Sequence, residues 1–164
     1  MLLFLFSSLL FAGECDPVVK KKNFYSRYEI VQCDEGLTEY IEFSKKYWED
    51  MGFLFRFDKD TVYDCKNTSD VLGKIYVRYD QEYVKEYEKA NNTIVGAVTS
   101  VQSFTDARIE NQIAYSEIFL KEDMKKPYIT VAHEFGHALG YDHVDDDCTG
   151  YLMNSYLNKM GDQF

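Results

Sequence analysis

Apolar residues recur along this chain with two spacings, one typical of helices and one typical of strands. Helical spacing occurs over 37–51 and from Pro127 to about Leu139, and the charged segment 81–90 also predicts a short helix. Alternating or clustered β-branched and aromatic residues predict strands over 28–33, 53–57, 74–79, 94–101 and 113–120. The polar stretch 58–70 predicts a loop, and 155–160 predicts a short final helix.

The order of these elements predicts an α+β fold. We expect a twisted mixed sheet of five strands, packed against the helix that begins at Pro127 and against one or two further helices. A chain of 164 residues has room for one such domain, and its 46% of hydrophobic residues are enough to form a core. The folded domain is therefore expected over 15–164.

The first fourteen residues predict a signal peptide rather than part of the fold. The run MLLFLFSSLLF carries no charged side chain and is followed by Ala12, Gly13 and the polar Glu14. We therefore expect a secreted chain, or a periplasmic or cell-surface one in a bacterium. A lipid anchor on Cys15 and a buried N-terminal helix are the alternatives. The basic segment 20–22 that follows is expected to be solvated.

Four cysteines in an exported chain favour disulfides. No two of them form a CxxC pair, which argues against a zinc site made of cysteines alone. Three pairings are possible, and of these we expect Cys15 with Cys33 and Cys65 with Cys148. If Cys15 were acylated instead, one of the other three cysteines would have no disulfide partner.

The charge balance narrows the class of partner. The chain has 28 acidic and 18 basic side chains and a formal net charge of -10, which repels phosphate backbones and argues against nucleic-acid binding. The apolar segment at the N-terminus is too short to cross a bilayer, so no transmembrane span is expected. We expect a monomer.

All three histidines of the chain lie within 133–143, which reads HEFGHALGYDH. His133 and His137 are four residues apart, so on a helix both imidazoles lie on one face and can reach one metal ion. Glu134 lies beside the first of them and can reach a water molecule on that ion. Structural histidines would be scattered along the chain, so this clustering predicts a metal site.

Gly140 and His143 complete the pattern. Glycine adopts positive φ without steric cost, so Gly140 is expected to end the helix and let the chain bend back. His143 can then supply a third nitrogen ligand. Three neutral nitrogen ligands leave the fourth position of a zinc ion open, which is typical of a catalytic site rather than a structural one.

Together, His133, Glu134, His137, Gly140 and His143 resemble the HExxHxxGxxH signature of the metzincin zinc peptidases. This family also has a methionine-containing turn beneath the metal, and Met153, within CTGYLMNSY, is the matching residue. The resemblance extends over 127–156 and is closest to the matrixin-like branch. It implies a zincin-like fold, a zinc cofactor and a secreted endopeptidase that acts on proteins or peptides.

The resemblance also implies roles for further residues. Glu134 would act as general base and then as general acid, passing a proton from water to the leaving amine. An extended substrate would lie along the strand predicted over 94–101, where Gly96 and Ala97 are candidate substrate-binding residues. Tyr156 would line the substrate pocket or help to bind the oxyanion.

Other interpretations remain open at this point. Another zincin class uses a downstream Glu as third ligand, but no Glu follows Glu134, so an Asp such as Asp142 would have to replace it. The acidic run 145–147 offers oxygen ligands for Ca²⁺. The chain can also be a non-catalytic zinc-binding module or a toxin-like interaction protein on the same fold. Finally, the Cys15 thiolate is a conceivable block on the metal, although a disulfide is the expected state.

Overall fold

The computed structural model describes residues 19, 21–23, 25–66, 72–104, 112–144, 148 and 151–154. Several features expected from the sequence lie outside these residues: the segment 1–14, Cys15, the acidic run 145–147, the helix expected over 155–160, and Tyr156. The segment 112–144, which carries the histidine motif, is described without a gap.

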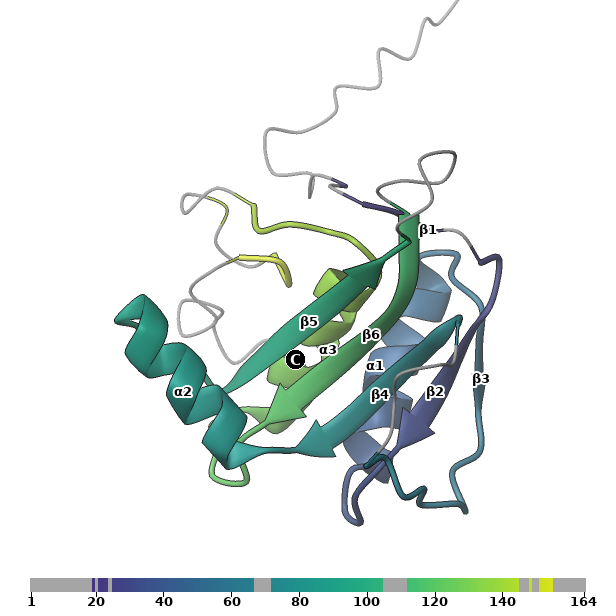
Figure 1. Cartoon of the computed structure of the whole chain (residues 1–164). Helices are drawn as coiled ribbons and strands as arrows, with labels where there is room; N and C mark the ends of the chain where they lie inside the picture. Colours follow the sequence, from purple (N-terminus) through teal and green to yellow (C-terminus); the bar gives the residue numbers. More distant parts are fainter. Residues whose placement is uncertain are drawn as a thin grey trace, which may run out of the picture.

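Three helices and six strands form the described part of the chain (Figure 1). The helices are α1 (Thr38–Asp50), α2 (Gln81–Asn91) and α3 (Pro127–Ala138). The strands are β1 (Lys22–Asn23), β2 (Tyr28–Gln32), β3 (Phe55–Phe57), β4 (Lys74–Tyr79), β5 (Ala97–Ser103) and β6 (Gln112–Leu120). Each of these three described helices begins and ends within one residue of the bounds that the sequence pattern predicts.

The six strands form one mixed sheet. Their order is β1–β6–β4–β2–β3 with parallel neighbours, and β5 pairs antiparallel with β6. Strands β4 and β5 both pair with the second half of β6, so they lie on its opposite sides. Within the described residues no strand pairs with the other side of β5, which is therefore an edge strand. The α+β class and the mixed sheet are thus confirmed, with β2 to β6 as the main strands.

The lysine-rich segment near the N-terminus belongs to this sheet. Lys22 and Asn23 form β1, which pairs with the start of β6. Lys21 donates its backbone N–H to the carbonyl oxygen of Gly140 at 3.3 Å and its Nζ to that of Val101 at 3.3 Å. For Lys21 and Lys22 the expectation of a solvated segment is therefore wrong, because their backbone groups are engaged by the sheet and by the turn after α3. Lys20 lies outside the described residues.

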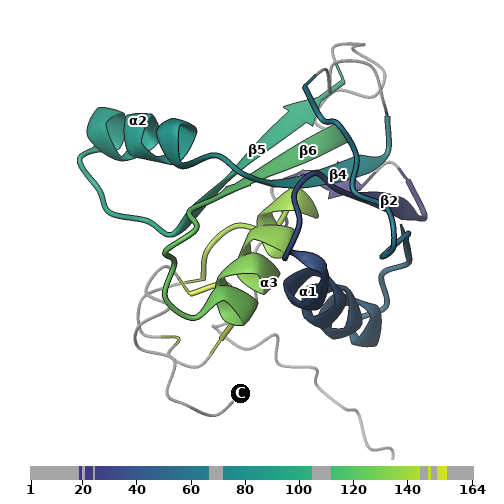
Figure 2. The same cartoon turned by 90° about the horizontal axis from the view of Figure 1, so that it is seen from below.

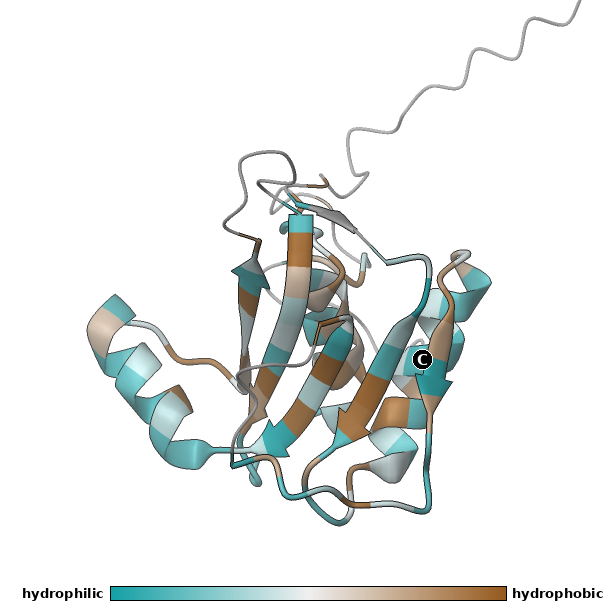
Figure 3. Cartoon of the chain, turned by 45° about the vertical axis from the view of Figure 1, so that its right-hand side comes forward, coloured by the Kyte–Doolittle hydropathy of each residue, from teal (hydrophilic) through white to brown (hydrophobic). Residues whose placement is uncertain are grey.

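Helices α1 and α3 pack together under one face of the sheet, whereas α2 lies apart at one end of it (Figure 2). The core lies between the two packed helices and the sheet, and it includes Trp48 of α1 and Phe135 of α3. Helix α2 is largely hydrophilic (Figure 3) and buries Val84. Among the described helices, none combines the length and the apolar character that crossing a membrane requires.

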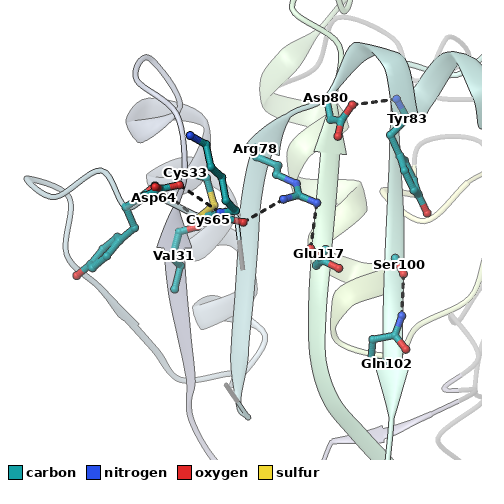
Figure 4. Close-up of polar contacts among 12 residues, drawn as sticks. Val31, Cys33, Asp64, Cys65, Arg78, Asp80, Tyr83, Ser100, Gln102 and Glu117 are labelled. Carbon is teal, nitrogen blue, oxygen red and sulfur yellow. Dashed lines mark hydrogen bonds and ion pairs between the residues drawn. A yellow bond between two sulfur atoms is a disulfide. The ribbon is translucent and has the colours of Figure 1, made fainter. Parts of the chain in front are cut away.

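The other face of the sheet carries a disulfide between Cys33 and Cys65 (Figure 4). This bond joins the end of β2 to the loop after β3, where the two Cα atoms are 5.6 Å apart. Cys148 is disulfide-bonded as well. The expected pairing of Cys33 with Cys15 and of Cys65 with Cys148 is therefore wrong, because the loop folds back over the sheet and brings Cys65 to Cys33.

Strand β5 begins at Ala97 rather than at residue 94. The loop before it is held by Glu88 of α2, whose Oε1 accepts hydrogen bonds from Val95 N–H at 2.8 Å and from Lys121 Nζ at 2.6 Å. The hydrogen bond from Lys121, followed by that from Val95, lowers the pKa of the Glu88 carboxyl. Lys121 is 33 residues from Glu88 in the sequence, so alternation within the 94–101 segment could not locate the start of the strand.

Candidate metal centre

The three histidines converge on one point. His133 and His137 come from successive turns of α3, and His143 follows the turn after that helix. Their Nε2 atoms are 3.1 Å apart in each of the three pairs. His133 is buried, His137 half-buried and His143 exposed, so the cluster is open to solvent on one side. The structure therefore brings the expected ligands close enough to hold a metal ion.

Gly140 allows the chain to turn back so that His143 reaches the other two rings. Its φ is +91°, in the left-handed region that favours glycine. A side chain at this position would also collide with the backbone oxygen of Lys21. The end of α3 is tied to the sheet by Ser116, whose Oγ donates to the carbonyl oxygen of Ala138 at 3.1 Å. The turn after α3 is therefore held by Lys21 at Gly140 and by Ser116 at Ala138.

Two backbone carbonyls determine which nitrogen of two rings carries the proton. His133 Nδ1 lies 2.6 Å from the oxygen of Leu152, and His137 Nδ1 lies 2.9 Å from the oxygen of Tyr141. Because a carbonyl oxygen can only accept, each Nδ1 carries a proton and donates it. In the neutral form of each ring, Nε2 is then left with a lone pair that faces the cluster.

His133 is neutral at physiological pH. Burial, followed by the neighbouring His137, lowers its pKa from 6.5 to about 3, although the hydrogen bond to Leu152 acts in the opposite direction. Neutral imidazole is the form that binds metal ions. The most buried ring of the cluster is therefore held in the protonation state that a ligand needs.

The geometry of the three nitrogens fits a divalent cation. When His133 and His137 are both neutral, their Nε2 atoms are two acceptors facing each other at 3.1 Å without a proton between them. A cation among the lone pairs would relieve this repulsion. In tetrahedral zinc sites with Zn–N bonds of about 2.0–2.1 Å, ligand nitrogens lie about 3.3 Å apart, close to the observed spacing. Imidazole suits zinc, copper, iron and nickel.

Trp48 of α1 supports the turn that holds His137. Its Nε1–H donates to the carbonyl oxygen of Ala132 at 2.8 Å, and its ring stacks on Tyr141 with centroids 5.3 Å apart. The carbonyl oxygen of Tyr141 is the acceptor for His137, so this stack positions the group that orients the imidazole. In the sequence pattern, Trp48 counts only as one apolar position of a helix.

Met153 packs against the helix that carries the histidines. Its side chain is 2% exposed, and its backbone oxygen accepts the N–H of Val144 at 3.0 Å. Gly136 of α3 makes this contact possible, because a Cβ there would overlap Met153 Sδ and lie 2.8 Å from the Trp48 ring. The absence of a side chain at this position therefore allows the 151–154 turn to lie directly on the helix.

We expect the Gly136→Ala substitution to lower the free energy of unfolding by about 1–3 kcal/mol, the usual cost of overpacking a core. In an unhindered helix the same change would stabilise by about 1 kcal/mol. Urea unfolding in the presence of a chelator measures the effect without a contribution from bound metal. Gly96→Ala is the matched control, because its added Cβ would meet Met124 at 3.4 Å, an ordinary contact. Equal stability of Gly136→Ala and the wild type would contradict the packing argument.

Glu134 lies beside His133 on α3, and its side chain faces β5. Thr99 Oγ1 is 2.5 Å from Glu134 Oε2 and 3.1 Å from the backbone oxygen of Glu134. The residue is 7% exposed. Burial raises the pKa of Glu134 from 4.5 to about 7, while the hydrogen bond from Thr99 acts in the opposite direction. A carboxyl group with a pKa near neutrality is suited to exchanging protons at physiological pH.

The Thr99 hydroxyl can serve Glu134 in either protonation state. A hydroxyl has one proton to donate and two lone pairs to accept. It can donate to the ionised carboxylate, or accept from the protonated carboxyl group while donating to the backbone oxygen of Glu134. The carboxyl group therefore has a hydrogen-bond partner before and after it gains a proton.

The histidine cluster and Glu134 lie in a groove of about 840 Å³ that follows β5. The residues 93–99 form one wall, and the segment between β6 and α3 contributes to the other. Gly96 and Ala97 both line this groove, as expected from the sequence. The expected ligands, the expected base and the expected substrate-binding residues therefore share one cavity.

The register of β5 shows which backbone groups face away from the sheet. The carbonyl oxygen of Gly96 accepts the N–H of Lys121 at 3.0 Å, so Gly96 turns its backbone toward the β6 side. Backbone direction alternates along an antiparallel strand, and therefore Ala97, Thr99 and Val101 turn their N–H and C=O groups toward the free edge. Sequence reasoning proposed Gly96 and Ala97 alike, whereas only Ala97 offers its backbone to the groove.

Sequence reasoning missed the residues that support the cluster. Thr99 contacts Glu134, and Trp48 supports the turn after α3. The carbonyl groups of Leu152 and Tyr141 orient the imidazole rings. A carbonyl group leaves no signal in a sequence, and a threonine in a strand is ordinary. Among the described residues, the group that can hold a metal ion consists of the three histidines and does not include Asp142.

Comparison with known proteins assigns no family. No protein-family model matches this chain, and no curated protein matches it significantly. The class of protein therefore has to follow from the chemistry of the site.

Proposed function

We propose that this chain is a zinc-dependent endopeptidase of the metzincin type, with zinc held by His133, His137 and His143. The observation that carries the proposal is the convergence of three Nε2 atoms beside a buried carboxyl group, in a groove that follows a free strand edge. Each of these three features is common in proteins on its own. Together they supply a metal site, a proton acceptor and a place for an extended peptide.

Zinc bound to the three imidazoles would supply Lewis-acid chemistry, since it acidifies water and polarises a carbonyl oxygen. The proton transfers belong to Glu134, which accepts a proton from the attacking water and then donates it to the nitrogen of the leaving amine. The Thr99 hydroxyl keeps the carboxyl group in place through both transfers. The carbonyl groups of Leu152 and Tyr141 keep the imidazole rings oriented.

The free edge of β5 supports the binding of an extended peptide as an added strand. The backbone groups of Ala97, Thr99 and Val101 would pair with the peptide backbone, which makes recognition partly independent of side chains. Because Thr99 contacts Glu134, a peptide paired at this position would pass close to the general base. The scissile bond is therefore placed beside Thr99 in this proposal.

Further features support the proposed metzincin-type fold and the proposed export of the chain. Met153 packs on α3 at Gly136, as a methionine turn beneath a metal-binding helix would. The apolar segment 1–14 favours export, and the disulfide between Cys33 and Cys65 is typical of an oxidising compartment. We therefore propose a secreted enzyme with a zincin-like fold.

Hydrolysis of a denatured protein substrate tests this function. We expect the purified protein to cleave such a substrate, 1,10-phenanthroline to abolish cleavage, and added Zn²⁺ to restore it after the chelator is removed. Elemental analysis of the same sample identifies the bound metal. Zinc binding without any hydrolysis would overturn the proposal in favour of a non-catalytic zinc-binding module, and cleavage that resists the chelator would exclude a role for the metal.

A further inference from the structure

The groove is short on one side of Thr99. Val19 forms an antiparallel bridge with Tyr141, and Lys21 Nζ donates to the carbonyl oxygen of Val101 at 3.3 Å. Lys21 thus occupies a backbone acceptor on the free edge of β5. Val101 lies two residues from Thr99, which corresponds to about 7 Å of extended chain. About two residues of a bound peptide therefore fit between Glu134 and this contact.

On the other side of Thr99 the groove continues past Ala97, between the 93–96 loop and the 121–126 segment. Both walls are held in place. Glu88 accepts hydrogen bonds from Val95 N–H and from Lys121 Nζ, and Lys121 N–H donates to Gly96 at 3.0 Å. This side is therefore a formed extension of the groove.

The extended side is basic in a chain with a net charge of -10. Its lining includes Lys121, Lys125 and Lys126 together with the acidic Asp123, and the Glu88 carboxylate of α2 lies against Lys121. Glu88 pairs with Lys121, whereas Lys125 is exposed to solvent. Over the whole chain acidic side chains outnumber basic ones by 28 to 18, so this reversal of charge is local. It favours an acidic partner at this end.

The direction of the peptide decides which of its residues meet these lysines. Antiparallel pairing is slightly more stable per residue than parallel pairing. A peptide antiparallel to β5 places the residues after the cleaved bond toward Ala97 and the lysines, and the residues before it toward Val101 and Lys21. The short side then receives the N-terminal part of the substrate.

We propose that the groove selects peptides with acidic side chains on the C-terminal side of the cleaved bond, and that it accommodates about two residues on the N-terminal side. This inference rests on the peptidase function proposed above. It identifies the substrate class by charge and by position.

Matched peptides test the charge preference. Internally quenched peptides that differ by Asp or Asn at each of the three positions after the cleaved bond isolate the effect of charge, because the two side chains have the same shape. We expect Asp to raise kcat/KM about fivefold over Asn at one or more of these positions, the scale of an exposed ion pair. The ratio is expected to fall in high salt.

Two charge reversals locate the effect in the groove. Lys125→Glu is expected to remove or invert the Asp preference. Lys59→Glu is the matched control, because Lys59 is exposed in the loop after β3 and does not line the groove. It is expected to leave the preference unchanged.

Shortening the peptide from its N-terminus tests the closed side. A peptide that keeps only two residues before the cleaved bond is expected to have a kcat/KM within about twofold of that of the full-length peptide. Removing one of these two residues is expected to lower kcat/KM more strongly. Lys21→Ala, which frees the Val101 oxygen, is expected to make a third residue contribute.

The outcomes separate this inference from the function on which it rests. If no peptide is cleaved in a chelator-sensitive way, the peptidase function is wrong and the inference fails with it. If the peptides are cleaved but Asp and Asn are equal, or if Lys125→Glu behaves like Lys59→Glu, the charge preference alone is overturned. A preference for Asp before the cleaved bond would overturn the proposed direction.

Discussion

The Glu134→Gln variant is expected to lose about 10²–10⁴-fold in kcat while its zinc content stays unchanged, the usual scale for removing a general base. Glutamine has nearly the same shape as glutamate and can still contact Thr99, but its amide cannot take up a proton from water. The three imidazoles are untouched by the change. Turnover and elemental analysis of the same preparation therefore separate proton transfer from metal binding.

Glu117→Gln is the matched control for this variant. Glu117 is a partly buried carboxylate on β6 that pairs with Arg78 at 3.2 Å, on the face of the sheet away from α3 (Figure 4). This change removes a negative charge of the same kind and is expected to leave kcat unchanged. Wild-type turnover by Glu134→Gln would refute the assigned role, and a large loss in both variants would indicate a general effect of charge or stability.

The His137→Ala variant is expected to lose both zinc and activity. His137 contributes one of three nitrogens, and its Nδ1 is the group that the Tyr141 carbonyl orients. Two remaining imidazoles bind zinc far more weakly than three. A ligand present at about 100 times its Kd stabilises a folded protein by about 2.7 kcal/mol. Added zinc should therefore raise the melting temperature of the wild type and leave that of His137→Ala unchanged.

Glu134→Gln provides the comparison for this experiment, because it keeps all three nitrogens. Its melting temperature is expected to rise with zinc as in the wild type, although it does not turn over substrate. Glu134→Gln is thus expected to bind zinc without activity, whereas His137→Ala is expected to show neither zinc binding nor activity. Full zinc content in His137→Ala would show that the metal does not bind between these histidines.

Helix α3 and its motif were predictable because they depend on local spacing. Pro127 is suited to the first turn of a helix, and Gly140 to the positive φ that ends it. Between them, a separation of four residues places His133 and His137 on the same face. Each relation involves residues within about one turn of each other, so the sequence pattern contains it.

The errors concern contacts between distant segments. The basic segment 20–22 was expected to be solvated, whereas Lys22 and Asn23 pair with β6. The disulfide joins Cys33 to Cys65 because a loop folds back over the sheet. Alternation of side chains within a segment reports whether the segment is a strand, but not which distant backbone it meets.

The chemistry of the candidate site divides in the same way. The three ligand nitrogens and their spacing follow from the eleven consecutive residues 133–143, because one helix and the turn after it are enough to bring three imidazoles together. The orientation and protonation of those rings depend on the carbonyl groups of Leu152 and Tyr141, and the environment of Glu134 depends on Thr99. Burial and hydrogen bonding arise only when separate elements pack together, and therefore no spacing along the chain could reveal them.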